Sequence, residues 1–105
     1  MKKVILDENL PEPLRHVLAD FEVVTVRFLG WSGIQNGELL KLVDQRFDVF
    51  LTGDKNLRYQ QNLTDREIAI IEVPYTRLDL LESMAGKIRV AISEVDPGGY
   101  FQVKV

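Results

Sequence analysis

The sequence predicts a three-layer α/β/α fold with a mostly parallel central sheet. Strand-like and helix-like segments alternate along the chain, which is typical of a parallel sheet covered by helices on both faces. Several strand-like segments are apolar runs without polar alternation, as in strands buried on both sides. Hydrophobic residues make up 46% of the 105 residues, enough for one core. We therefore expect a single domain spanning residues 1–105.

The expected elements follow from local patterns. We expect strands at about residues 2–6, 22–26, 48–52, 67–73 and 100–105, and helices at about residues 11–19, 37–47, 55–63 and 77–95, the third of them short and irregular. Pro11 suits a first helical turn, and Asn36 is a candidate N-cap. Pro74 ends the fourth strand. The last strand alternates polar and apolar residues, which favours an edge position with one solvent-exposed face.

Right-handed crossovers and short connections favour the strand order 2-1-3-4, with the C-terminal strand at an edge. This order places the first and third strands side by side, about 4.8 Å apart, with the topological switch point between them. In open α/β sheets, ligands bind at the carboxyl ends of the strands near such a point. Asp7 and Glu8 directly follow the first strand and therefore lie in this region.

Three carboxylates are candidates for one site. Asp7 ends the first strand, Asp54 follows the third, and Glu38 opens the second helix, whose N-terminus we expect on the same rim. Gathered carboxylates repel one another unless they bind protons or share a hard cation. Mg²⁺ or Mn²⁺ held by carboxylates and water can orient a phosphodiester and activate a water molecule. The pattern thus favours metal-dependent hydrolysis.

Each acid also has an ordinary structural interpretation. Asp7 can cap the turn into the first helix, Asp54 can be the N-cap of the helix after it, and Glu38 suits a helix N-terminus because of the helix dipole. The conjunction of all three at one sheet edge is what favours a site.

Three segments resemble the small PIN-like proteins. They are Leu6-Asp7-Glu8-Asn9-Leu10-Pro11, the helix opening Gly37-Glu38-Leu39-Leu40, and Leu51-Thr52-Gly53-Asp54-Lys55-Asn56, in the same order as in that family and within about the first 75 residues. The resemblance implies a PIN fold and a Mg²⁺- or Mn²⁺-dependent ribonuclease, many of which are toxins of toxin–antitoxin pairs. It implies that Asp7, Glu38 and Asp54 are catalytic metal ligands. RNA and an antitoxin protein are the implied partners.

The sequence departs from the PIN-like pattern at Asn56, where the family usually carries a further acid. Asn56 can still coordinate a metal through its carbonyl oxygen, but it brings no charge. Asn36 likewise stands where an acid is common. A catalytically weak or inactive PIN-like module that binds a protein partner is therefore an alternative. A third alternative is a phospho-acceptor receiver domain with Asp54 as the acceptor.

Basic residues flank the expected acidic rim. Arg27, Lys55 and Arg58 are candidates for phosphate contacts, or else ordinary solvated charges. The net charge of −3 argues against broad, charge-driven binding of nucleic acid. Trp31 is interpreted either as a base-stacking residue or as an anchor of its loop.

Composition and hydrophobicity bear on the cellular location of the protein. Cysteine is absent, and the sequence has no apolar run of membrane length and no signal-peptide pattern. We therefore expect a cytoplasmic protein that has no membrane contact. A homodimer is left open.

Overall fold

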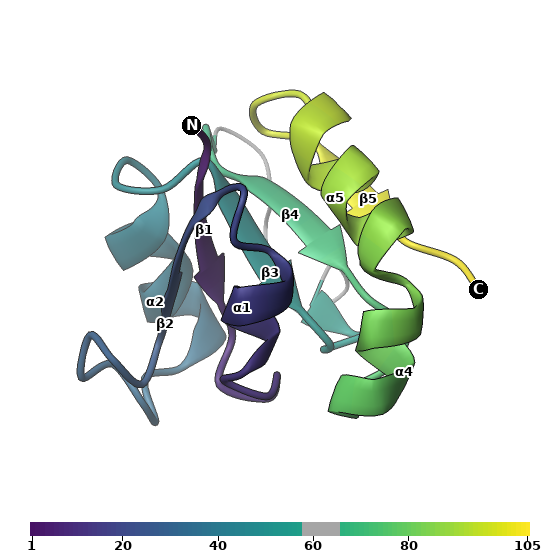
Figure 1. The fold of residues 1–105 in the computed structure, drawn as a ribbon. Coiled ribbons are helices and arrows are strands. Elements are labelled where there is room, and N and C mark those ends of the chain that lie inside the picture. Colours follow the sequence, from purple (N-terminus) through teal and green to yellow (C-terminus); the bar gives the residue numbers. More distant parts are fainter. Residues whose placement is uncertain (58–65) are drawn as a thin grey trace.

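Five parallel strands form the central sheet in the computed structural model, which describes residues 1–57 and 66–105 (Figure 1). The strands are β1 (Lys3–Leu6), β2 (Glu22–Thr25), β3 (Val49–Thr52), β4 (Ala69–Glu72) and β5 (Tyr100–Gln102). Their order in the sheet is β2-β1-β3-β4-β5. This confirms the order expected from the sequence, with the C-terminal strand at one edge.

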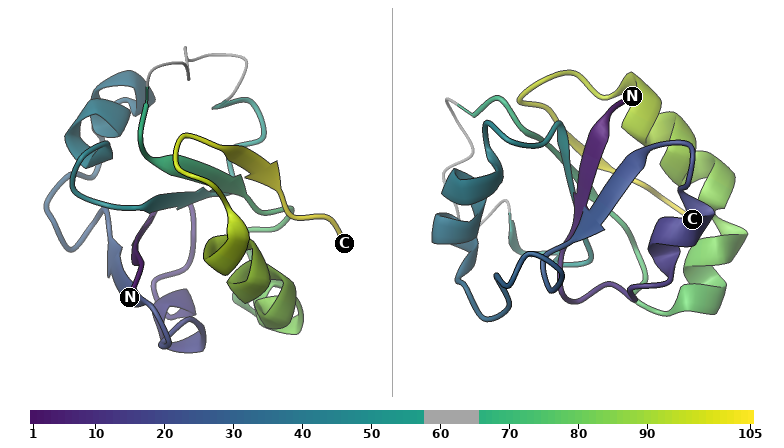
Figure 2. Two further views of the ribbon diagram at one scale, coloured as in Figure 1. Left: turned by 90° about the horizontal axis from the view of Figure 1, so that it is seen from above. Right: turned by 60° about the vertical axis from the view of Figure 1, so that its left-hand side comes forward.

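Helices cover both faces of the sheet. They are α1 (Leu14–Val17), α2 (Asn36–Val43), α4 (Leu78–Ser83) and α5 (Ala85–Glu94). Figure 2 shows α2 on one side of the sheet and α1, α4 and α5 on the other. The chain therefore has the three-layer α/β/α arrangement that the sequence predicts.

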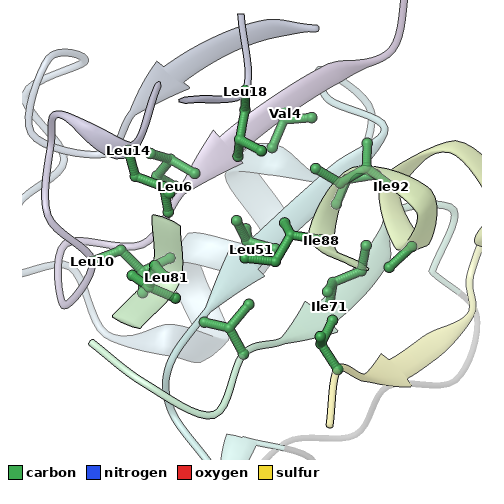
Figure 3. Packing of buried hydrophobic residues seen from close by; sticks show 14 of the residues in the cluster. Val4, Leu6, Leu10, Leu14, Leu18, Leu51, Ile71, Leu81, Ile88 and Ile92 are labelled. Carbon is green, nitrogen blue, oxygen red and sulfur yellow. The ribbon is translucent and has the colours of Figure 1, made fainter. Parts of the chain in front are cut away.

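Two apolar clusters hold the layers together, because alternate residues of each strand point to opposite faces. On the α1/α4/α5 side, Leu6 and Leu51 of the sheet are buried in one cluster with Leu14 of α1 and Ile88 of α5 (Figure 3). On the α2 side, the buried cluster comprises Ile5, Val26, Leu39, Leu40, Val43, Phe50, Leu57, Ile68 and Ile70. Burying each side chain of this size contributes about 1.5–3 kcal/mol.

The first helix is shorter than expected. The sequence predicts a helix over residues 11–19, whereas α1 spans Leu14–Val17. Pro13 disfavours helical backbone at the preceding Glu12, so the regular helix begins only after Pro13.

The predicted helix over residues 77–95 is wrong as a single element. It is divided into α4 and α5 at Met84, whose backbone (φ −109°, ψ 10°) departs from helical values. The Ser83 hydroxyl donates a 2.6 Å hydrogen bond to the Leu80 carbonyl. Such back-bonding competes with the helical ladder and bends helices.

The other boundaries differ by a few residues. The last strand ends at Gln102 rather than at residue 105. The second helix begins with Gln35 as N-cap, so Asn36 is its first residue instead of its cap. The predicted helix over residues 55–63 lies largely outside the described residues.

Candidate functional site

Asp7 lies at the carboxyl end of β1, next to the end of β3. Its backbone N–H donates to the Leu51 carbonyl at 2.9 Å, which continues the β1–β3 pairing by one residue. The side chain is buried, with 7% of its surface exposed. Oδ2 accepts a 2.7 Å hydrogen bond from the Thr52 hydroxyl, and Oδ1 accepts one from the Glu8 N–H at 2.8 Å. The carboxylate is thus fixed in place by both neighbours.

Asp54 is joined to Asp7 through Thr52. The Asp54 N–H donates to Thr52 Oγ1 at 3.0 Å, while the same hydroxyl donates to Asp7. The Asp54 carboxylate accepts from Asn36 Nδ2 at 3.1 Å and from the Asn56 N–H at 2.9 Å. The second bond closes a short Asx turn after β3, which is how an Asp side chain commonly stabilises a turn. The structure therefore brings Asp7 and Asp54 together at the switch point.

Electrostatics make this position unfavourable for an isolated carboxylate. Burial raises the pKa of Asp7 above its usual 3.8, and the nearby charges of Glu8 and Asp54 raise it further. The hydrogen bonds from Thr52 and from the Glu8 N–H act in the opposite direction. A group in this environment gains from binding a proton or a cation.

Glu38 has a different placement from the other two acids. It is exposed in the first turn of α2, two positions after the Asn36 that contacts Asp54. Within residues 1–57 and 66–105, no three His, Cys, Asp or Glu side chains are arranged to hold a metal ion. Glu38 therefore does not complete a ready-made ligand triad with Asp7 and Asp54. The metal-ligand roles of these residues, and of the exposed Asn56, remain predictions.

The remaining residues of the Leu6–Pro11 segment have structural contacts. The Glu8 carboxylate accepts from the Gly33 N–H at 3.1 and 3.3 Å, which ties the loop after β2 to the site. Asn9 Oδ1 accepts from the Gly53 N–H at 3.3 Å. A Cβ at Gly53 would lie 2.7 Å from Thr76 Cγ2, so a larger residue there requires a shift. These contacts fix the turn that carries Asp54.

Two of the three predicted RNA-contacting residues lie in the described part of the chain, and both are exposed. Lys55 is exposed beside Asp54, and Arg27 is exposed just beyond the end of β2. Arg58 lies outside the described residues. Trp31 is partly buried against the α2-side cluster, with the Arg46 guanidinium 5.5 Å from the ring centre. This contact supports its interpretation as an anchor of the loop.

Sequence reasoning missed a buried carboxylate, Glu72, in the same row of residues. The register pairs Glu72 with Thr52 on one side and with Gln102 on the other. Glu72 is 6% exposed. It accepts hydrogen bonds from the Tyr100 hydroxyl at 2.6 Å and from Gln102 Nε2 at 3.1 Å. The available signal was an acid at the last position of an otherwise apolar strand.

Asp7, Thr52 and Glu72 all point toward the α2 side of the sheet. Strand alternation gives each of them the same direction as the apolar residue two positions earlier: Ile5, Phe50 and Ile70 are all in the α2-side cluster. The carboxyl ends of β1, β3 and β4 therefore form a polar row directly beyond that cluster.

Comparisons with protein-family models, with curated proteins and with solved structures gave no match. In the part of the chain that the structure describes, no helix has the length and apolar character needed to cross a membrane.

The donors at the switch point fit a hard cation by their chemistry. They are carboxylate and amide oxygens, which are the ligands that Mg²⁺ and Mn²⁺ prefer. Burial and the charges of Glu8 and Asp54 raise the pKa of Asp7, so a positive charge nearby would stabilise its ionised form. A divalent cation would offset the negative charge, and Asp7 and Asp54 are the carboxylates that would hold it.

Proposed function

We propose that this chain is a Mg²⁺- or Mn²⁺-dependent ribonuclease of the PIN-like type. The observation that carries the proposal is the Asp7–Thr52–Asp54 linkage at the switch point of a parallel sheet. The Thr52 hydroxyl links the buried Asp7 carboxylate to the backbone of Asp54. Two neighbouring acids, one of them buried, are suited to binding a divalent cation. The resemblance of three segments to PIN-like proteins supplies the substrate class.

In this proposal, Asp7 and Asp54 bind the cation, and the Thr52 hydroxyl contacts the Asp7 carboxylate and the Asp54 N–H. The Asn56 carbonyl and Glu38, in the first turn of α2, are the further ligands. When bound, the cation stabilises charge on the phosphodiester and lowers the pKa of an attacking water. Lys55, Arg27 and Arg58 hold the phosphate backbone of the RNA. The assignment to a toxin–antitoxin pair, with an antitoxin as partner, is supported by the sequence resemblance.

Cleavage of end-labelled single-stranded RNA tests the proposal. We expect cleavage in Mn²⁺ that stops in a chelator and falls by more than about 100-fold in Asp7→Asn and Asp54→Asn, because even changes beside metal ligands commonly cost 10–100-fold. Asp79→Asn is the matched control, since Asp79 is exposed on α4. Equal cleavage by Asp7→Asn and the unaltered protein would contradict the proposal.

A second candidate function is a PIN-like module without catalysis that acts by binding a protein partner. The observation that favours it is the lack of a three-acid group among the described residues, together with Asn56 where an acid is usual. The two functions differ in the unaltered protein, because the ribonuclease cleaves RNA in Mn²⁺ and the module does not. In a module whose metal site is dormant, Asn56→Asp should introduce Mn²⁺-dependent cleavage.

A further inference from the structure

The outer surface of α5 is incompletely covered by its own chain. A groove of about 790 Å³ runs between α5 and the edge strand β5 and is lined mainly by apolar side chains. Val90 on α5 is 54% exposed, and Phe101 on β5 is 49% exposed. Figure 1 shows α5 at the outside of the fold, with β5 next to it. This face will be called the α5–β5 face.

Gly86, the second residue of α5, lines this face. Its φ is not positive, and no atom lies within 4 Å of a Cβ built at this position. A residue with no side chain lets a second backbone approach closely. Gly86 therefore leaves open space beside the first turn of α5.

The charges of α5 are arranged against the dipole of the helix. Lys87 lies in its first turn and Glu94 in its last, whereas the dipole favours acids at the start and bases at the end. Lys87 donates to the Lys104 carbonyl at 3.3 Å on the rim of the groove. Lys87 and Glu94 lie about 10 Å apart along the helix axis, too far for a direct pair.

We propose that a second copy of this chain docks on the α5–β5 face, with the two α5 helices antiparallel. A two-fold axis between Val90 and Ala91 brings Lys87 opposite Glu94 of the partner subunit, and Glu94 opposite Lys87 of the partner subunit. The reversed charges then form two pairs, as an isologous interface requires. The exposed Val90 lies at the centre of the contact.

The proposed interface is separate from the candidate metal site. The α5–β5 face belongs to the side of the sheet covered by α1, α4 and α5, whereas Asp7 and Thr52 point toward α2. The dimer proposal therefore does not depend on the proposed nuclease function, and either can fail alone.

Sedimentation equilibrium of the full chain, over roughly 1–100 μM, tests the dimer. We expect a dimer for the unaltered protein and a monomer for Val90→Glu, which places a charge at the centre of the contact. Lys87→Glu and Glu94→Lys should each weaken the dimer by roughly tenfold in Kd, because each places like charges opposite one another. Lys41→Glu, a charge reversal on the exposed surface of α2, is the matched control and should leave the dimer unchanged.

The double reversal Lys87→Glu/Glu94→Lys gives the sharpest result. In the antiparallel arrangement it restores both pairs and hence the dimer. Thermal unfolding of each variant serves as the control, because a cooperative transition is expected if the monomer is folded. A monomer at every concentration overturns the proposal, as does a dimer that survives Val90→Glu. A double reversal no tighter than the single variants overturns the antiparallel geometry.

Discussion

The hydroxyl of Thr52 donates a 2.7 Å hydrogen bond to Oδ2 of Asp7 across the boundary between β3 and β1. Both side chains are almost fully buried, with 0% and 7% of their surfaces exposed. The same hydroxyl accepts the Asp54 N–H, so one neutral residue links the Asp7 carboxylate to the backbone of the turn that carries Asp54. The Asp54 carboxylate itself is held by Asn36 and by the Asn56 N–H.

Thr52→Val tests this link, since valine keeps the shape and removes the hydroxyl. The buried Asp7 oxygen loses its donor, so we expect a loss of about 1–3 kcal/mol in the free energy of unfolding. The pKa of Asp7 should rise further, because the Thr52 bond lowers it. Denaturant unfolding and an NMR titration of the Asp7 carboxyl measure both effects. Thr52→Ser, which keeps the hydroxyl, should leave the pKa near that of the unaltered protein.

Asp7→Asn should change how the free energy of unfolding depends on pH. The native pKa of Asp7 lies above its usual 3.8, so the native state binds the carboxyl proton of Asp7 more tightly than the unfolded chain does. The contribution of Asp7 to stability is then greatest below pH 3.8 and declines as pH rises through the native pKa. We expect the free energy of unfolding of Asp7→Asn, minus that of the unaltered protein, to increase over this window without metal. A flat difference would show that folding leaves the pKa of Asp7 unchanged, and a falling one would show that the native state stabilises its charged form; either contradicts the prediction.

Asn56→Asp should strengthen the binding of Mg²⁺ or Mn²⁺. The Asn56 N–H already contacts the Asp54 carboxylate, so a new charge at position 56 is introduced next to the proposed cation site. Ligand charge is one determinant of affinity, and we expect Kd to fall at least roughly tenfold in calorimetric titration. Gln45→Asp adds the same charge just beyond the far end of α2 and is the control. Equal affinities in the two variants would mean that residue 56 does not face the metal.

RNA binding should depend on salt through the basic residues near the rim. Single-stranded RNA loses affinity with a slope of about −0.7 per phosphate contact in a plot of log K against log salt. Replacing Lys55 and Arg58 by alanine should flatten the slope by roughly one to two units. Ca²⁺ in place of Mn²⁺ fills the site while slowing cleavage. Lys41→Ala, on the exposed surface of α2, should leave the slope unchanged.

An unchanged slope after both replacements would place the RNA elsewhere on the surface. An absence of RNA binding in the unaltered protein would instead favour the partner-binding module, with Trp31 and its loop as the next surface to alter.

The apolar strands were predictable because their pattern reflects burial on two faces. Val4-Ile5-Leu6 and Val49-Phe50-Leu51 are buried as expected, and the right-handed crossover rule gave their adjacency. The break at Met84 was not predictable in the same way. The apolar stripe of Leu81, Ile88 and Ile92 continues across it, since both helices pack on one cluster. The hydrophobic periodicity therefore predicts which face is buried, but it does not predict whether the helix is continuous.

The candidate site was predictable only in part. Strand ends place Asp7 and Asp54 near each other, because neighbouring parallel strands end at the same edge. The joining role of Thr52 depends on a side-chain rotamer, and the burial of Glu72 depends on contacts with β5, distant in sequence. Local pattern carries neither kind of information. Asn36 illustrates the same limit: the predicted N-cap instead donates its side-chain amide to Asp54.

The effect of Mn²⁺ on thermal unfolding tests the central claim most directly, because a ligand that binds the native state must stabilise it. At about ten times Kd, the account predicts a gain of about 1.4 kcal/mol, and hence a rise of several degrees in Tm for the unaltered protein and for Asp79→Asn. It predicts no rise for Asp7→Asn or Asp54→Asn. An equal rise in Asp7→Asn, or no rise in the unaltered protein at any Mn²⁺ concentration, would contradict a metal site built on Asp7 and Asp54.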